Sequence, residues 1–314
     1  MMNRFAQLLF WTGRYMERAE NHARLIDVNY HMRHEIRGNQ YDQDYVWEKL
    51  VAAVEDVSSF KSNHSIANER NALHFLTFES SNSNSIYSLI QQTRSNIRTL
   101  RQLLPGELWE TVNSFYLWLK DQDVHQMMLQ SPYMFYQRIR EWVLLFNGAA
   151  DSMMTREQEW HFIQAGKYLE RTENTARILH NISANLSNDN NYSQEQNNYH
   201  RMIVLLKSVG GYEAFRKFHA NDVTFAKVLE FLLFNPGFPR SIHFALTSLE
   251  SYLKVIKQED YDYTLLSVKA ILDGLDDRHS GHGGSDLLHD LLQSCNQLGY
   301  SISKTFFQEE IVGA

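Results

Sequence analysis

The chain has 314 residues, of which 43% are apolar and 13% aromatic, and its formal net charge is −7. This composition provides for a sizeable buried core, and the negative charge argues against nucleic acid as a partner. The single cysteine, Cys295, excludes an intramolecular disulfide and a zinc site built on paired cysteines, and it suits a reducing compartment. The sequence contains neither a signal peptide nor an apolar run of about 18 residues. We therefore expect a cytoplasmic protein with no membrane association.

Long proline-free segments predict an all-α fold. Only four prolines occur, where average usage would give about sixteen. Apolar residues recur at spacings of three and four, and alternation with a period of two is nowhere sustained. The predicted helices, in chain order, span residues 3–36, 43–59, 66–78, 85–103, 107–120, 132–152, 155–185, 197–208, 222–234, 241–257, 264–277 and 285–309.

Three polar tracts between these helices are predicted to be surface loops. They are SSNSN at 80–84, SNDNNYSQEQNN at 187–198, and the glycine-rich segment at 276–285. Each lacks the apolar residues that a packed element needs.

Two motifs recur along the chain at nearly the same offset. GRYMERAENHAR at 13–24 returns as GKYLERTENTAR at 166–177, and FLTFESSNSNSI at 75–86 returns as FLLFNPGFPRSI at 231–242. Matches at one offset indicate a duplicated half. We therefore predict a helical bundle built from two tandem pseudo-repeats, residues 1–153 and 154–314, packed together as one helical domain.

The first motif forms a ladder of charged residues along one side of a helix. At about 100° per residue, its charged side chains fall within roughly 120°, opposite an apolar face. Glu20 and Arg24, like Glu173 and Arg177, have the favourable acid-first spacing of four residues. A solvated helix face with such pairs is the simplest interpretation, since each exposed pair contributes only about 0.3–0.5 kcal/mol.

Two observations favour buried ion networks instead. Large apolar residues, among them Phe10 and Leu25, interrupt the charged arc, and the two copies keep the same charges while their neighbours differ. A solvated face would tolerate lysine for arginine or aspartate for glutamate. We predict that the ladders either brace the two halves or line a shared polar cleft. The ladder residues predicted to bind an anion are Arg14, Glu17, Arg18, Glu20, Arg24, Glu170, Arg171, Glu173 and Arg177.

The second motif predicts a capped helix start beside an arginine. In NPGFPRSI, two prolines and a glycine fix a turn, Ser241 is placed to cap the following helix, and Arg240 precedes it. A helix N-terminus with an adjacent arginine favours a bound anion, although an ordinary loop and cap would have the same sequence. The counterpart at Asn84 and Ser85 keeps the cap without the arginine. Arg240 and Ser241 therefore join the predicted anion site.

No metal site, cofactor or catalytic residue is predicted. Asp27, His31, His34 and Glu35 have spacing that suits one helix face, but the partner helices lack the Glu-x-x-His pairs of a di-iron bundle. A second group of histidines has no cysteine support for zinc. That group comprises His279, His282 and His289, with Asp290. Phosphate-loop, nucleophile-elbow and HExxH motifs are absent from the sequence.

The repeated motifs, together with TRSNIRTLRQLLPGELWETVN in the first half, resemble the bacterial alpha-E family, an all-helical group with a repeated Glu-Arg motif. The resemblance spans essentially the full chain. It identifies Glu17-Arg18 and Glu170-Arg171 as the family's Glu-Arg pairs, and the segment from Pro239 to Ser241 as its later motif.

The same resemblance implies partners. Genes of this family are typically neighbours of circularly permuted ATP-grasp proteins and of transglutaminase-like proteins, which suggests a system that makes or modifies peptides through amide bonds. We therefore expect an accessory component of an ATP-grasp-type ligase system that binds a carboxylate or phosphate in an Arg/Glu-lined cleft. Two alternatives remain: a self-sufficient enzyme with Glu17 or Glu170 as general base, and a purely structural scaffold.

Overall fold

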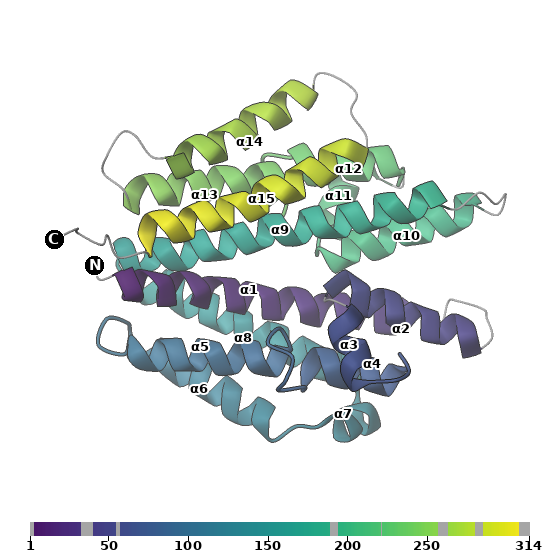
Figure 1. Cartoon of the computed structure of the whole chain (residues 1–314), viewed down its shortest axis with the longest axis horizontal. Coiled ribbons are helices and arrows are strands. Elements are labelled where there is room, and N and C mark those ends of the chain that lie inside the picture. Colours follow the sequence, from purple (N-terminus) through teal and green to yellow (C-terminus); the bar gives the residue numbers. More distant parts are fainter. Residues whose placement is uncertain are drawn as a thin grey trace. The chain divides into compact units, whose positions relative to one another are not determined.

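The structure is a computed structural model of the chain, and it describes residues 3–32, 40–54, 57–188, 194–220, 222–256, 263–279 and 285–307. Every regular element in these ranges is an α-helix, which confirms the predicted all-α fold (Figure 1). The helices are α1 Asn3–Met32, α2 Gln40–Val54, α3 Val57–Asn63, α4 Glu69–Thr77, α5 Ile86–Thr99, α6 Gly106–Lys120, α7 Val124–Gln130, α8 Pro132–Met153, α9 Gln158–Asn188, α10 Gln194–Ser208, α11 Tyr212–His219, α12 Phe225–Phe234, α13 Ile242–Ile256, α14 Tyr263–His279 and α15 Ser285–Phe306.

The predictions missed the short helices. The helix predicted over 43–59 is two elements, α2 and α3, and neither α7 nor α11 was predicted. Helices α3, α7 and α11 have seven or eight residues, about two turns, in which an amphipathic period is hardly distinguishable from an irregular segment.

One of the three predicted loops is confirmed and two are shorter than predicted. Residues 80–84 form turns between α4 and α5. The polar tract at 187–198 is helical at both ends, since α9 runs to Asn188 and α10 begins at Gln194. Likewise α14 runs to His279 and α15 begins at Ser285. Polar residues carry no apolar signal, so the sequence pattern ended α9 and α14 too early and began α10 too late.

The chain divides into two compact units. Unit 1 comprises Met1–Arg14, Met154–Leu206 and Gly211–Ala314, and unit 2 comprises Tyr15–Met153 with Lys207–Gly210. Helix α1 contributes its beginning to unit 1 and its remainder to unit 2.

Unit 1 is built around a ring of four helices. Helix α9 packs against α13 and α15, and α14 packs against both of these helices in turn, so the ring closes (Figure 1). Leucine and isoleucine side chains fill its interior, among them Leu169, Leu246 and Ile302, all fully buried. Helices α11 and α12 follow one another alongside this ring.

The first turns of α1 cross α9 at two glycines, Gly13 and Gly166, both within unit 1. A Cβ on Gly13 would overlap the backbone carbonyl of Ile163 and lie 2.9 Å from its carbon. A Cβ on Gly166 would meet the carbonyl of Phe10 in the same way. The crossing is reciprocal, because each glycine lies against the residue three positions before the other. Glycine thus allows the two helix backbones to touch.

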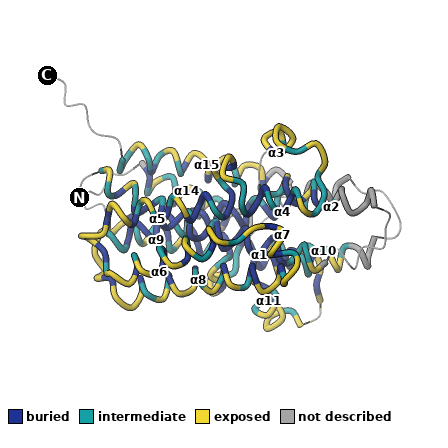
Figure 2. The backbone as a smooth tube through the Cα atoms, turned by 90° about the horizontal axis from the view of Figure 1, so that it is seen from below, coloured by how far each residue is buried: buried dark blue, intermediate teal, exposed yellow. Residues whose placement is uncertain are grey.

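Unit 2 has a comparable core. Helix α6 packs against α5 and α8, and α4 packs against α2, α5 and α7. Buried and exposed positions alternate every few residues along α6 and α8, as expected for helices with one face on a core (Figure 2). Tyr136 is fully buried there and shares a hydrogen bond of 2.9 Å with Thr77. Burial is the main reason that the pKa of Tyr136 is raised far above that of a free tyrosine.

The two predicted helix caps are confirmed. The Ser241 hydroxyl accepts from the backbone N–H of Phe244 at 3.1 Å, and Ser85 accepts from Ser88 at the same distance. Ser241 also donates to the carbonyl of Asn235 at 2.5 Å, which closes the turn before α13.

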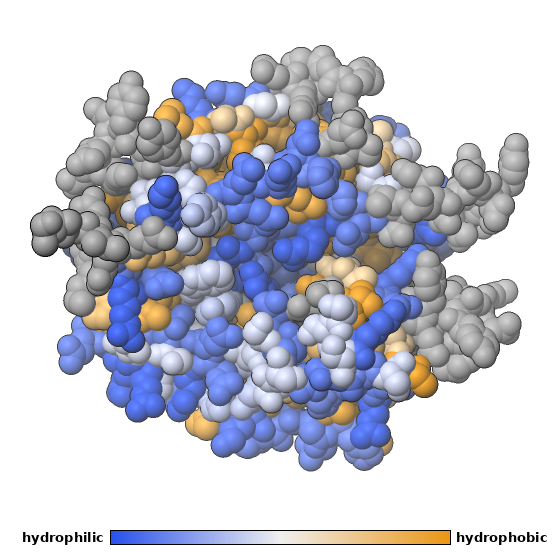
Figure 3. Space-filling view, viewed as in Figure 1, coloured by the Kyte–Doolittle hydropathy of each residue, from blue (hydrophilic) through white to orange (hydrophobic). Residues whose placement is uncertain are grey.

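Among the described residues, no helix combines the length and apolarity that a bilayer crossing requires. The face drawn in Figure 3 is predominantly hydrophilic, and hydrophobic side chains reach it in separate places.

Candidate functional site

The charged ladders are buried, as predicted. Glu17 and Glu170 are each only 1% exposed, and Arg171 is 8% exposed. Arg14, Glu20 and Glu173 are buried as well, whereas Arg18, Arg24 and Arg177 are partly exposed. The simpler interpretation, two solvated helix faces, is therefore wrong.

In unit 1, Arg14 of α1 lies between two carboxylates of α9. Its Nε donates to Glu170 Oε2 at 2.8 Å, and its Nη2 pairs with Glu173 Oε2. The Trp11 ring lies 5.1 Å from the Arg14 guanidinium. One buried arginine with two carboxylate partners makes charge-assisted bonds, which are stronger than bonds between neutral groups. The pairing depends on the glycine crossing, which brings the start of α1 onto α9.

The only cysteine lies beside this ion network. Cys295 of α15 is fully buried and free. Burial raises the pKa of its thiol strongly, and Glu173 adds to that rise while Arg14 opposes it. A thiol in this setting stays protonated and behaves as a small apolar group.

In unit 2, the predicted pair of Glu20 and Arg24 is confirmed within α1. The Arg24 guanidinium lies against Gly210, which has a φ of +65°. A Cβ there would come within 3.1 Å of Arg24 Nη1. Gly210 therefore satisfies both a left-handed backbone conformation and the close approach of an arginine.

The arginine of each Glu-Arg pair reaches a loop that precedes a later helix, α5 in unit 2 and α13 in unit 1. Arg18 Nη1 donates to Asn84 Oδ1 at 2.5 Å in unit 2, just before α5. Arg171 Nη1 donates to the carbonyl of Pro239 at 3.3 Å in unit 1, just before α13. The two copies of the motif thus make equivalent attachments.

A further bond anchors the loop in unit 1. Thr175 Oγ1 donates to the carbonyl of Arg240 at 3.0 Å. Arg171 also lies over the Tyr168 ring, with its guanidinium carbon 5.1 Å from the centroid. Unit 1 therefore brings Arg171, a residue of the charged ladder, to the helix start at which the second motif places Arg240 and Ser241.

The structure shows only part of the two histidine groups that the sequence analysis considered as metal ligands. Asp27 forms an ion pair of 2.7 Å with Arg140 and lies 3.3 Å from His31. His34 and Glu35 lie outside the described residues, as do the side chain of His279 and all of His282. His289 and Asp290 are exposed on α15.

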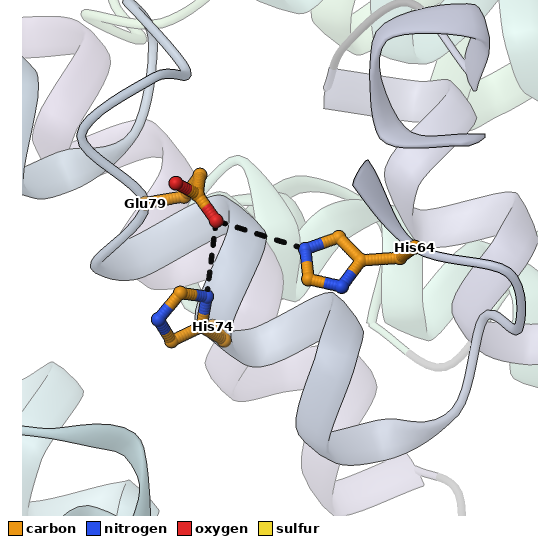
Figure 4. Close-up of side chains that lie close together, drawn as sticks. All are labelled: His64, His74 and Glu79. Carbon is orange, nitrogen blue, oxygen red and sulfur yellow. Dashed lines mark ion pairs between the residues drawn. The ribbon is translucent and has the colours of Figure 1, made fainter. Parts of the chain in front are cut away.

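The structure gathers one group that the sequence analysis did not single out. Ligand atoms of His64, His74 and Glu79 in unit 2 all lie within 4.8 Å of one another (Figure 4). Burial lowers the pKa of His64, and His74 reinforces this effect while Glu79 opposes it. Irregular chain separates His64 from His74, so no helical spacing links the three residues.

A depression of about 480 Å³ lies between α6 and α8 in unit 2. None of the predicted anion-binding residues lines it. Its walls are formed by Glu107, Glu110, Thr111, Leu144, Leu145, Gly148, Ala149, Ser152 and Met153.

The helical fold and the Glu-Arg pairs on α1 and α9, whose glutamates are buried, define the class of this protein, an α-helical protein organised around a repeated Glu-Arg motif. More specifically, the chain belongs to the Alpha-E family, described as a predicted alpha-helical domain with a conserved ER motif, whose model matches residues 1–307. The resemblance that the motifs carried is thereby confirmed.

Curated relatives extend the match without adding an activity. Uncharacterized proteins of Mycobacterium bovis and Mycobacterium tuberculosis strain CDC 1551 are each 26% identical to this chain over 261 residues. A protein of strain H37Rv is 25% identical over the same length. The matched region covers 78% of this chain and 29% of each relative. No solved structure matches the chain.

Proposed function

We propose that the protein is a helical partner of an ATP-grasp-type peptide or amide ligase system, and that it binds a carboxylate or phosphate at the start of α13. One observation carries the anion site: the loop before α13 holds Arg240 and is bonded through its backbone to Arg171 and Thr175. Two arginines and a helix N-terminus therefore favour negative charge at one place.

The equivalent loop of unit 2 supplies an internal comparison. It has the same cap, Ser85, and the same attachment from a motif arginine, Arg18. Asn84 stands where unit 1 has Arg240. With one arginine fewer, this loop is a weaker anion site, so we propose a single site per chain.

In this proposal the remaining ladder residues are structural. Arg14 holds Glu170 and Glu173, and Arg24 holds Glu20. An anion would have to displace buried carboxylates to reach Arg14, and a general base at Glu170 would have to break the same ion pair. The buried pairs thus favour a scaffold with one binding loop over a self-sufficient enzyme.

We also propose that the chain consists of two copies of one helical unit, in agreement with the repeated motifs. Three parallels support it: the reciprocal glycine crossing, the two serine caps and the two arginine-to-loop bonds.

Replacing Arg240 with glutamine is expected to weaken anion binding by roughly 10- to 150-fold, because a hydrogen bond to a charged group contributes about 1.5–3 kcal/mol. Calorimetric titration of the full chain with inorganic phosphate, and separately with a short acidic peptide, measures this. Arg138→Gln is the matched control, since it removes the same charge from an exposed ion pair on α8. Equal binding by wild type and Arg240→Gln would contradict the anion site.

The partner half of the proposal is tested separately. Co-expressed with a circularly permuted ATP-grasp-type protein from the same organism, the chain is expected to elute from size-exclusion chromatography as a complex, whose mass light scattering measures. Arg240→Gln should leave the complex intact if the anion is a substrate group, and should dissolve it if the anion belongs to the partner's surface. Separate elution of both wild-type proteins would contradict the partnership.

A further inference from the structure

The cluster of His64, His74 and Glu79 lies outside the Glu-Arg ladders and the α13 loop, and neither the motifs nor the family description assigns it a role. Two imidazoles and a carboxylate form the protein ligand set of many catalytic zinc sites, which keep a fourth position open. Each side chain is only partly exposed, and His74 is the most accessible at 40%.

Contacts within the local fold hold each of the three side chains in place. His64 follows α3, and its ring stacks on Phe60 with centroids 5.0 Å apart, while Phe75 meets it edge-on. His74 lies in the last turn of α4, whose start is capped by Asn68. The backbone N–H of Glu79 donates to the carbonyl of His74 at 3.0 Å, which folds Glu79 back beside it.

The carboxylate itself is oriented toward the two rings. Ser81 Oγ donates to Glu79 Oε1 at 3.0 Å, and the other oxygen, Oε2, faces both histidines (Figure 4). Outer hydrogen bonds of this kind fix the orientation of ligating side chains in metal sites.

The two separations from the carboxylate are too long for hydrogen bonds and close to those between ligands of one metal ion. Glu79 Oε2 lies 3.4 Å from His74 Nδ1 and 3.7 Å from His64 Nε2. N–H···O hydrogen bonds are normally about 2.7–3.2 Å long. Ligand atoms about 2.0–2.1 Å from a tetrahedral zinc ion lie about 3.3–3.5 Å apart.

One ligand atom also lacks a hydrogen bond, although Glu79 Oε2 lies 3.7 Å from it. His64 Nε2 is buried and makes no hydrogen bond among the described residues. An unsatisfied buried nitrogen costs free energy, and a bound metal ion would satisfy it. From this geometry we infer that His64, His74 and Glu79 bind one Zn²⁺ ion per chain, through His64 Nε2, His74 Nδ1 and Glu79 Oε2, with water in the fourth position.

Unit 1 contains a close counterpart without the ligands. His219 stacks on Phe215 with centroids 4.5 Å apart and meets Phe231 edge-on, as His64 does with Phe60 and Phe75. In the repeated motif, however, Glu230 and Asn235 occupy the places of His74 and Glu79. Among the described residues, no metal-binding group forms around His219. This histidine is therefore a matched control for ring packing without metal ligation.

Calorimetric titration of the full chain with Zn²⁺ is expected to show one tight site. His74→Gln and Glu79→Gln should each weaken binding at least about tenfold, while His219→Gln should leave it unchanged. Because His74 and Glu79 are partly exposed, the variants are expected to fold, and far-ultraviolet circular dichroism checks this. Cobalt(II) should give the visible absorption of a four- or five-coordinate ion with wild type and lose it in both ligand variants.

Three results would overturn the inference. These are no uptake of Zn²⁺ by wild type at a ratio of one per chain, binding by His74→Gln as tight as that of wild type, and an equal loss of binding in His219→Gln. None of these outcomes bears on the Arg240 site, because the two experiments use different probes and different variants.

Discussion

Replacing Gly166 with alanine is expected to lower the free energy of unfolding by at least about 3 kcal/mol, a large value for one added methyl group. The new Cβ would overlap the backbone carbonyl of Phe10, and a backbone cannot rotate away as a flexible side chain can. The two helices would have to separate, which would also pull Arg14 away from Glu170 and Glu173. Gly13→Ala should behave alike, because its Cβ meets Ile163 in the same way.

Thermal unfolding followed by circular dichroism measures the effect, which at about 2–4 °C per kcal/mol corresponds to roughly 6–12 °C. Gly148→Ala is the control. Gly148 is also helical, but a Cβ there meets no atom within 4 Å, so the substitution should stabilise the helix by about 0.5–1 kcal/mol. The double variant Gly13→Ala/Gly166→Ala should cost less than the sum, because both residues lie at one crossing. Melting temperatures within a degree of wild type would show that the helices do not touch there.

The sequence shows that the two glycines of the crossing recur, but it does not show what they contact. The repeated motif begins with glycine in both copies, so the identity of Gly13 and Gly166 was visible from the sequence. Its reason was not, because a helical glycine can mark a close approach or simply a tolerated residue. The reciprocal contacts with Phe10 and Ile163 give that reason.

Burial of the charges could be predicted, whereas their partners could not. Apolar residues within the charged arc indicated that the ladder was buried, and spacing gave the pair Glu20 and Arg24. Arg14 has its partners more than 150 residues away, at Glu170 and Glu173. A pattern within one helix does not determine which second helix crosses it, so long-range pairs require the tertiary structure.

The histidine cluster was missed for a related reason. Metal motifs are recognised when regular spacing places ligands on one helix face or in one turn. Here His64 lies beyond one helix, His74 within the next, and Glu79 in the turn that follows. The ring of His64 is held by stacking on Phe60 and by an edge contact with Phe75. In a sequence, aromatic residues near a histidine ordinarily indicate a hydrophobic core.

Arg14→Met is expected to lower the free energy of unfolding by about 3–5 kcal/mol, because it leaves two buried carboxylates without their counter-charge. Glu170 and Glu173 are 1% and 6% exposed, so water cannot replace the lost guanidinium unless the helices open. Urea unfolding followed by circular dichroism measures the change. The midpoint should fall while the m-value, the slope of the unfolding free energy against urea concentration, stays constant. Arg138→Gln, which breaks an exposed ion pair with Glu141, should stay within about 0.5 kcal/mol of wild type.

A triple variant separates the cost of stranded charge from the loss of packing. When Glu170→Gln and Glu173→Gln accompany Arg14→Met, no ionised group of the trio remains, so the triple variant should be more stable than Arg14→Met alone. Phosphate affinity should stay at the wild-type value in a folded triple variant, since the proposed anion site uses Arg171 and Arg240. If the triple variant is folded but no longer binds phosphate, Arg14 belongs to the binding site, and the division between a structural ladder and a single binding loop is wrong.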